Sequence, residues 1–273
     1  MRLLVVCIFF ALSIACGGTG GISDKISSSE TPKSAATPSV KAASNGPEAV
    51  VIDSPDGVKL AGTYNKATES KSPALLLLHQ WQSDHHSYDK FAKVMHEKGF
   101  TILAIDGRGF GGSTKKADGT AVTAGRTEAD VKAMLGDVDA AFNYLAKQEN
   151  VDPTRIGIVG ASYGSSLALI YAADHQNVAA VALLSPGLNY FGNMPTEPAI
   201  GQYGDRPLYL LAAMDDRESA DAVNKLSSIT RDKTNYSQTI HRSGGHGTAL
   251  LEVGGTEELE DFFSRSLGVG KKN

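Results

Sequence analysis

The sequence predicts an α/β protein in which helices flank a mostly parallel sheet of eight strands, without a separate cap domain. Residues 74–78 and 101–105 are continuous apolar runs, which is typical of strands buried on both faces. Segments with helical spacing, of which 126–147 is the longest, alternate with such runs and predict βαβ units. A Ser-Pro-Asp-Gly turn at residues 54–57 separates two further β-rich runs and predicts a leading hairpin at one edge.

The expected elements follow one another without an internal repeat. Strands are expected over residues 49–53, 58–64, 74–78, 101–105, 155–159, 178–184, 208–213 and 236–242. Helices are expected over residues 88–98, 126–147, 163–173, 219–226 and 257–267. Residues 185–206 contain Gly, Pro and Asn but no clear periodicity, so we expect a loop there.

Composition limits what the folded part can bind. The 273 residues carry a formal net charge of −4, which provides no basic surface for nucleic acid. Hydrophobic residues make up 41% of the chain, which is enough for a large core. Both cysteines, Cys7 and Cys16, lie near the N-terminus, so we expect no disulfide and no thiolate metal site in the body of the protein.

The first residues have the pattern of an export signal. Arg2 precedes an apolar run at residues 3–14, which is too short to span a bilayer comfortably. Residues 13–16, Ser-Ile-Ala-Cys, resemble a bacterial lipobox, although Ser13 stands where leucine is preferred. The resemblance implies lipidation of Cys16 and a lipid-anchored protein of the bacterial cell envelope, at the outer membrane or periplasmic face. The alternative is an ordinary signal peptide.

Three segments are therefore expected along the chain. Residues 1–15 form a lipoprotein signal peptide. Residues 16–48 comprise the lipidated cysteine and a disordered tether, since they are rich in Ser, Thr, Ala, Pro and Gly and poor in apolar groups. Residues 49–270 form one folded domain.

Residues 160–164, Gly-Ala-Ser-Tyr-Gly, fit the G-x-S-x-G pattern of a nucleophile at a sharp turn between a strand and a helix. An expected strand ends at Val159 and an expected helix begins at Tyr163, which is the context that the motif requires. The glycines leave room in a tight turn, and a helix N-terminus favours developing negative charge. A buried serine at a helix start is the structural alternative, but the context favours Ser162 as the nucleophile.

The segments 137–141 (Asp-Val-Asp-Ala-Ala), 151–156 (Val-Asp-Pro-Thr-Arg-Ile) and 160–164 together resemble the α/β-hydrolase superfamily. Two branches are similar: the dienelactone-hydrolase-like esterases and the catalytic domains of prolyl-oligopeptidase-type peptidases. Dienelactone hydrolases proper use a cysteine nucleophile, whereas this chain has Ser162. The oligopeptidases carry a propeller domain, for which the N-terminal tether is too short. The resemblance covers the chain from residue 49 onward and implies the α/β-hydrolase fold.

The resemblance also implies a catalytic histidine, because in this fold the chain order is serine, acid, histidine. Four histidines precede Ser162, and His175 follows it too closely for an acid to intervene. His241 lies within an expected strand, where a structural role is favoured. His246 lies in a glycine-lined loop after the last strand, where the family places its catalytic histidine.

The acid is expected just after the strand at 208–213. The family usually shows a small residue, two variable residues and then the catalytic aspartate. Counting from Ala213 selects Asp216, whereas counting from Ala212 selects Asp215. Asp216 is favoured, and the other aspartate is expected to be solvated or to cap the following helix.

The resemblance further implies two backbone N–H groups for an oxyanion hole. One is the amide of Tyr163, directly after the nucleophile. The other is the amide of Trp81 in the loop after the strand at 74–78, where Gln80 replaces a glycine that relatives often have. Trp81 is the only tryptophan and is expected to line the acyl side of the cleft.

Two further patterns are read as structural. Five residues of the 79–89 segment contain metal-ligating groups, but the histidines are not at ligand spacing and we expect no metal; they are His79, Asp84, His85, His86 and Asp89. Residues 106–113, Asp-Gly-Arg-Gly-Phe-Gly-Gly-Ser, resemble the D-x-R-G-x-G-x-S turn of these hydrolases and are expected to be scaffold rather than a phosphate site.

The expected function is the hydrolysis of carboxylic esters through an acyl-enzyme, with no cofactor. The loop at 185–206 predicts an open cleft without a lid and a preference for short acyl chains. A peptidase or amidase is one alternative, because the same triad serves both reactions. A non-catalytic surface lipoprotein is another, but its expected signature is a lost triad residue and none is missing. The expected partners are a small-molecule ester and, through Cys16, a membrane.

Overall fold

The computed structural model describes residues 46–230 and 232–269. The expected signal peptide, Cys16 and most of the expected tether lie outside these residues. The strands are β1 (Glu48–Asp53), β2 (Lys59–Asn65), β3 (Ser72–Leu78), β4 (Thr101–Ile105), β5 (Val151–Ala161), β6 (Ala180–Leu184), β7 (Asn189–Tyr190), β8 (Met194–Pro195), β9 (Leu208–Ala213) and β10 (Tyr236–His241). The helices are α1 (Asp89–Glu97), α2 (Glu128–Ala146), α3 (Tyr163–Asp174), α4 (Thr196–Tyr203), α5 (Arg217–Ile229) and α6 (Gly255–Leu267), with 3₁₀ helices η1 (His85–Tyr88) and η2 (Gly247–Val253).

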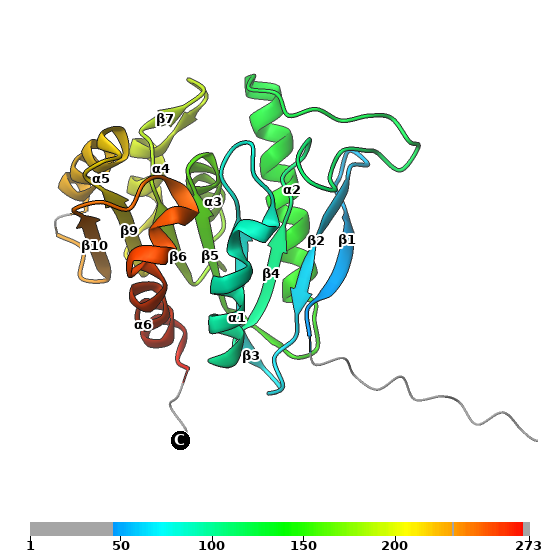
Figure 1. Ribbon diagram of the computed structural model, residues 1–273, viewed down its shortest axis with the longest axis horizontal. Coiled ribbons are helices and arrows are strands. Elements are labelled where there is room, and N and C mark those ends of the chain that lie inside the picture. The colour runs from blue at the N-terminus through cyan, green and yellow to red at the C-terminus, as the bar shows by residue number, and fades with distance from the viewer. Residues whose placement is uncertain (1–45, 231, 270–273) are drawn as a thin grey trace, which may run out of the picture. The chain divides into compact units, whose positions relative to one another are not determined.

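Eight strands form one sheet in the order β1-β2-β4-β3-β5-β6-β9-β10 (Figure 1). The leading hairpin pairs antiparallel, as does β2 with β4, and every other neighbouring pair is parallel. The predicted fold class is therefore confirmed, including the antiparallel strands at one edge.

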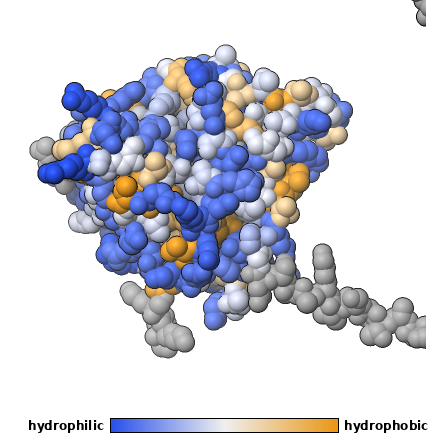
Figure 2. Space-filling view, in the orientation of Figure 1, coloured by the Kyte–Doolittle hydropathy of each residue, from blue (hydrophilic) through white to orange (hydrophobic). Residues whose placement is uncertain are grey.

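Helices cover both faces of the sheet. Alternate residues of β3 enter different clusters: Leu76 and Leu78 pack with α2 and α3, whereas Leu75 and Leu77 pack with α1 and α6. This burial on both faces explains why the strand is a continuous apolar run rather than an alternating one. Helix α1, for example, buries Phe91 and exposes Lys93. On the face of the molecule shown in Figure 2, hydrophilic residues predominate and hydrophobic residues are scattered.

The expectation of a loop over residues 185–206 is wrong. This segment contains the two-stranded β7–β8 hairpin and helix α4, whose Ile200 and Tyr203 are fully buried against the layer that contains α3. The hairpin turn places Phe191 and Gly192 at φ values of 58° and 73°, as tight hairpin turns require. The segment adds two short elements to the sheet's edge rather than a separate cap domain.

The parallel strands end at nearly the same level. Leu78 pairs with Gly160, Ala161 with Leu184, and Leu184 with Leu211. The residues that follow these strands therefore meet at one edge, which is where ligands bind in open α/β sheets. In the part of the chain that the structure describes, no helix is both long and apolar enough to cross a membrane.

Candidate active site

Ser162 occupies a strained turn between β5 and α3. Its backbone has φ 54° and ψ −124°, a conformation that costs a non-glycine residue about 1–3 kcal/mol. Its N–H donates to the Leu184 carbonyl at 2.8 Å, and its own carbonyl accepts the Ser165 N–H at 2.8 Å. These contacts with β6 and α3 hold the strained residue in place, and its side chain is 6% exposed.

The two glycines of the motif are needed for close packing. A Cβ on Gly160 would lie 2.2 Å from the Gly164 carbonyl oxygen, and a Cβ on Gly164 would lie 2.6 Å from the Leu78 carbonyl oxygen. Both distances are far below contact distance, and both involve backbone atoms that cannot move aside. The motif therefore fixes how closely α3 approaches β5 and β3.

His246 is hydrogen bonded to Asp216, with 2.7 Å between Nδ1 and Oδ2. Asp216 follows β9 and His246 follows β10. The neighbouring Asp215 turns elsewhere and accepts the N–H groups of Gly244 and Gly245 at 3.1–3.3 Å. The structure thus brings Asp216, and not Asp215, to His246. No hydrogen bond joins His246 to Ser162 within the described residues, and such contacts often form only when substrate is bound.

Asp216 remains ionised at neutral pH. Burial acts to raise the pKa of its carboxyl, but the facing Ser219, His246 and Ser185 side chains together hold that pKa below its ordinary value. Of these, the Ser219 hydroxyl is buried and makes no well-formed hydrogen bond with the described residues. An ionised carboxylate accepts the Nδ1–H of His246 and leaves Nε2 as the free basic atom.

Ser185 and Tyr190 belong to the site but were not expected from the sequence. Ser185 follows β6, is fully buried at φ 48°, and its Oγ accepts the Gly247 N–H at 2.9 Å. Its hydroxyl also faces the Asp216 carboxylate, so one serine connects the acid to the loop that carries His246. The Tyr190 hydroxyl donates to the Ser185 carbonyl at 3.0 Å. A Ser directly after a strand end was the available signal for this role.

The two expected oxyanion donors are free. The Tyr163 amide is the first of α3, where N–H groups have no intrahelical acceptor. The Trp81 amide has no hydrogen-bond partner among residues 46–230 and 232–269. Gln80 does not need to be glycine, because the left-handed residue of this loop is Gln82 at φ 58°. The Gln80 side chain instead reaches the histidine loop, where its Oε1 accepts the Thr248 N–H at 3.4 Å.

The His79 side chain fixes the loop that contains Gln80 and Trp81. Its Nε2 accepts the Gly107 N–H at 2.8 Å, so Nδ1 carries the proton that it donates to the Gln80 carbonyl at 2.7 Å. The ring is 2% exposed, and burial lowers the pKa of His79. A neutral His79 therefore connects residues 79–82, which we call the oxyanion loop after their expected role, to the turn after β4.

Four aromatic rings form a wall beside the oxyanion loop. The Trp81 ring centroid lies 4.9 Å from Phe110, 5.3 Å from Tyr163 and 4.7 Å from Phe191. Phe191 comes from the tip of the β7–β8 hairpin, so the segment expected to be a loop supplies part of the wall. We refer to Trp81, Phe110, Tyr163 and Phe191 as the aromatic wall.

A family model described as alpha/beta hydrolase fold matches residues 73–235. The chain belongs to the α/β-hydrolase fold family.

This α/β-hydrolase fold protein is also similar to individual proteins and solved structures. An uncharacterised protein of Mycobacterium tuberculosis is 30% identical over 156 residues, which cover 57% of this chain and 51% of that protein. The chain thus spans about half the length of the curated relatives it matches. A Pyrococcus furiosus esterase superposes with a TM-score of 0.66 at 17% identity, over 82% of this chain and 92% of the esterase. A dienelactone hydrolase from Anabaena variabilis gives 0.62 at 18% identity, over 81% and 98%. At these identities the structural likeness shows the fold.

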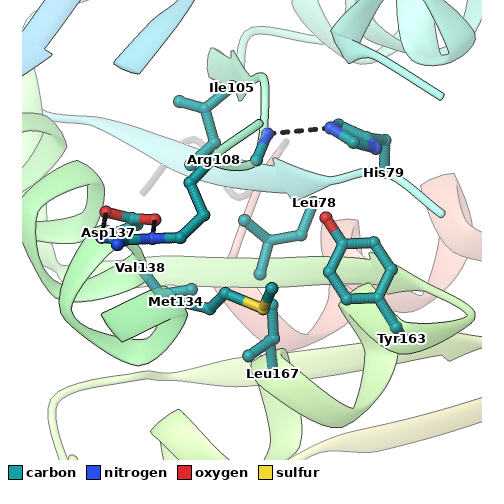
Figure 3. Close-up of a pocket in the computed structure, with 10 residues that line it drawn as sticks. Leu78, His79, Ile105, Arg108, Met134, Asp137, Val138, Tyr163 and Leu167 are labelled. Carbon is teal, nitrogen blue, oxygen red and sulfur yellow. Dashed lines mark hydrogen bonds and ion pairs between the residues drawn. The ribbon is translucent and has the colours of Figure 1, made fainter. Parts of the chain in front are cut away.

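An enclosed cavity lies beneath the oxyanion loop, against the buried ion pair of Arg108 and Asp137 (Figure 3). His79, Tyr163 and Met134 are among the residues that line it. Its volume is about 20 Å³, which suits one water molecule but no substrate. The cavity is therefore part of the scaffold and not the substrate cleft.

The residues of the D-x-R-G turn are engaged in structural contacts. Arg108 pairs with Asp137 at 2.6 Å and with Asp56 at 2.9 Å. Asp106 accepts the Gly112 N–H and the Nδ1–H of His85, at 2.7 and 2.6 Å. Within residues 46–230 and 232–269, no three His, Cys, Asp or Glu side chains converge as a metal site would require.

Proposed function

We propose that this α/β-hydrolase is a serine hydrolase that cleaves carboxylic esters through an acyl-enzyme. Ser162 Oγ attacks the acyl carbon while His246 Nε2 takes its proton, and Asp216 orients His246. His246 then returns the proton to the leaving alcohol. A water molecule, activated by the same histidine, releases the acid and restores Ser162. The reaction needs no cofactor.

The oxyanion that forms at each step would accept the N–H groups of Trp81 and Tyr163. Both donors are free of protein partners, and Tyr163 starts α3, whose dipole favours negative charge. Donors fixed in this way stabilise the transition state without reorganising. This geometry supports acyl transfer rather than a binding role.

The observation that carries the proposal is the 2.7 Å bond between His246 and Asp216 at the strand edge that also bears Ser162. A contact between His246 and Asp216 that served only stability would not require the strained Ser162 at the same edge. An acid, a base and a nucleophile that act together require all three residues there. Membership of the hydrolase family and the likeness to an esterase support the same reading.

The second candidate is a peptidase or amidase, because the same residues could cleave amides. Solved structures of both kinds share the fold, a Pyrococcus furiosus esterase at a TM-score of 0.66 and a Pyrococcus horikoshii acylaminoacyl peptidase at 0.67, so activity must distinguish the two reactions. The test compares p-nitrophenyl acetate and butyrate with peptide p-nitroanilides at equal concentrations. Turnover of the esters with no turnover of the anilides supports the proposal. Faster release from the anilides would make the protein an amidase, and no turnover of either would favour a non-catalytic role.

We also propose that Cys16 is lipidated and holds the domain at the bacterial cell envelope, on the outer membrane or the periplasmic face. The apolar run and the sequence around Cys16 support this placement. The small-molecule ester would then be met outside the cytoplasm.

A further inference from the structure

Arg126 stacks on the aromatic wall. Its guanidinium carbon lies 4.9 Å from the centroid of the Trp81 ring and 5.0 Å from that of Phe191. The segment is fixed there, because Asn193 of the hairpin turn donates to the Arg126 carbonyl at 2.9 Å. A guanidinium held over two aromatic faces keeps its N–H edge available for a planar anion.

No acid neutralises this guanidinium. Among the described residues, no carboxylate forms an ion pair with Arg126, which is exposed. The two acids nearest in sequence have other positions. Asp130 accepts the N–H and the hydroxyl of Thr127 in the capping box that starts α2. Glu128 lines a separate hollow together with Lys132. An arginine that is held in place by stacking and has no carboxylate partner can bind a carboxylate through two parallel N–H···O hydrogen bonds.

The position relates Arg126 to the proposed reaction. Trp81 carries the ring on which Arg126 stacks and also the amide proposed for the oxyanion. The Tyr190 hydroxyl faces the Ser162 side chain, and the Tyr190 ring lies 6.3 Å from that of Phe191, on which Arg126 also stacks. An acyl chain attached at Ser162 and lying along the aromatic wall would therefore extend toward Arg126.

We propose that Arg126 binds a carboxylate at the far end of the acyl group, so that the preferred substrates are monoesters of dicarboxylic acids. This inference rests on the proposed ester hydrolysis and names its substrate class. Trp81 and Phe191 of the aromatic wall would contact the apolar part of the acyl chain. Arg126 would supply a bidentate, charge-assisted pair of hydrogen bonds to the terminal carboxylate.

The test uses two substrates with the same acyl chain, p-nitrophenyl hydrogen adipate and methyl p-nitrophenyl adipate, in which the far end is a free carboxylate or its uncharged methyl ester. For the wild-type protein, kcat/KM is expected to be about tenfold higher for the anion, chiefly through KM, as for one partly exposed charged hydrogen bond. Because the guanidinium is exposed to solvent, the ratio of kcat/KM for the anionic ester to that for the uncharged ester should decrease as the salt concentration is raised from about 0.05 to about 0.5 M. The Arg126→Gln variant should bring the ratio close to one.

Two controls separate the possible causes. Lys132→Gln removes a nearby exposed charge outside the wall and should keep the wild-type ratio. Arg126→Lys keeps the charge without the planar fork and should retain part of it. A wild-type ratio near one, or a ratio that Arg126→Gln leaves unchanged, would overturn the inference while hydrolysis of both esters upholds the proposed function. Failure to hydrolyse either ester would overturn both.

Discussion

At the scale of single residues, two adjacent aspartates have different tasks. Asp216 bonds His246 at 2.7 Å, whereas Asp215 accepts the amides of Gly244 and Gly245. One carboxylate orients the ring, and the other shapes the glycine loop on which the ring is carried. Because successive side chains after a strand point in different directions, the two roles cannot be exchanged.

This division predicts that Asp216→Asn reduces kcat far more than Asp215→Asn. Loss of the carboxylate at 216 removes the partner that fixes the His246 tautomer, and a fall of about 10³–10⁴-fold is expected. Loss of the carboxylate at 215 weakens the contact with two exposed amides and should cost about tenfold or less. Steady-state hydrolysis of p-nitrophenyl butyrate by the two variants is the measurement, and the reverse ranking would assign the acid to Asp215.

His79 predicts a dependence of stability on pH. Burial lowers the pKa of His79 below its ordinary value of 6.5, so near and below pH 6.5 the unfolded chain binds more protons than the folded one. The contribution of His79 to stability should therefore be full above that pH and decline as the pH falls. Urea unfolding of the wild type and of His79→Asn should give a larger difference at about pH 7.5 than at about pH 5.5. A difference that grows on acidification would contradict the neutral, buried His79.

The sequence points to some residues of the candidate site and not to others. The motif locates Ser162, and chain order selects His246, since both depend on the succession of elements. The choice between Asp215 and Asp216 depends on one step of the chain, which only the backbone direction after β9 decides. Ser185 was missed because its contact with Gly247 joins segments 62 residues apart.

At the scale of elements, the segment between β6 and β9 departs most from expectation. The hairpin turn uses Phe191 and Gly192 rather than the Asn-Gly or Asp-Gly pairs that signal such turns. Helix α4 has eight residues and includes Pro198 and Gly201, which depress helix propensity. Tertiary packing forms both elements: Thr196 Oγ donates to the Gly187 carbonyl at 2.8 Å, and Ile200 is fully buried.

The shortness of this segment predicts the acyl length that the site accepts. The β7–β8 hairpin contributes Tyr190 and Phe191 but no amphipathic lid, so only the first carbons of a neutral chain should be buried, each CH₂ worth about 0.8 kcal/mol. Activity on neutral p-nitrophenyl esters should be highest at roughly two to four carbons, where that gain ends. Phe191→Ala should reduce the gain from acetate to butyrate, and a chain-length series measures both effects. A preference for about ten carbons or more would reveal a deep acyl tunnel.

At the scale of the whole domain, the arrangement of the sheet assembles the site. The segments after β3, β5, β6, β9 and β10 carry Trp81, Ser162, Ser185, Asp216 and His246, the residues of the candidate site. The strands β3, β6 and β9 are fully buried apolar runs, which is the pattern that predicts parallel strands covered on both faces, whereas β10 is a more polar strand at the edge of the sheet. Strand ends were less certain: β5 begins at Val151, whereas its expected start was residue 155, because Asp152, Pro153 and Thr154 interrupt the apolar pattern.

The N-terminal segment predicts how the whole protein is held. If Cys16 is lipidated, the wild type should require detergent for extraction from the membrane fraction, and Cys16→Ser should be soluble or uncleaved. A chain that begins at Gly46 should be soluble and as active as the full-length protein, because the site lies within the described domain. Wild-type protein found free in the aqueous fraction without detergent would refute the anchor.

The central claim is that Ser162 is the nucleophile, and covalent labelling tests it most directly. A fluorophosphonate probe should label the wild-type protein once per chain, and peptide mapping by mass spectrometry should place the label on Ser162. The Ser162→Ala variant should remain folded, take up no label, and lose ester hydrolysis by about 10³-fold or more. Labelling at another serine, or a folded Ser162→Ala variant that keeps more than roughly a tenth of wild-type activity, would contradict the account.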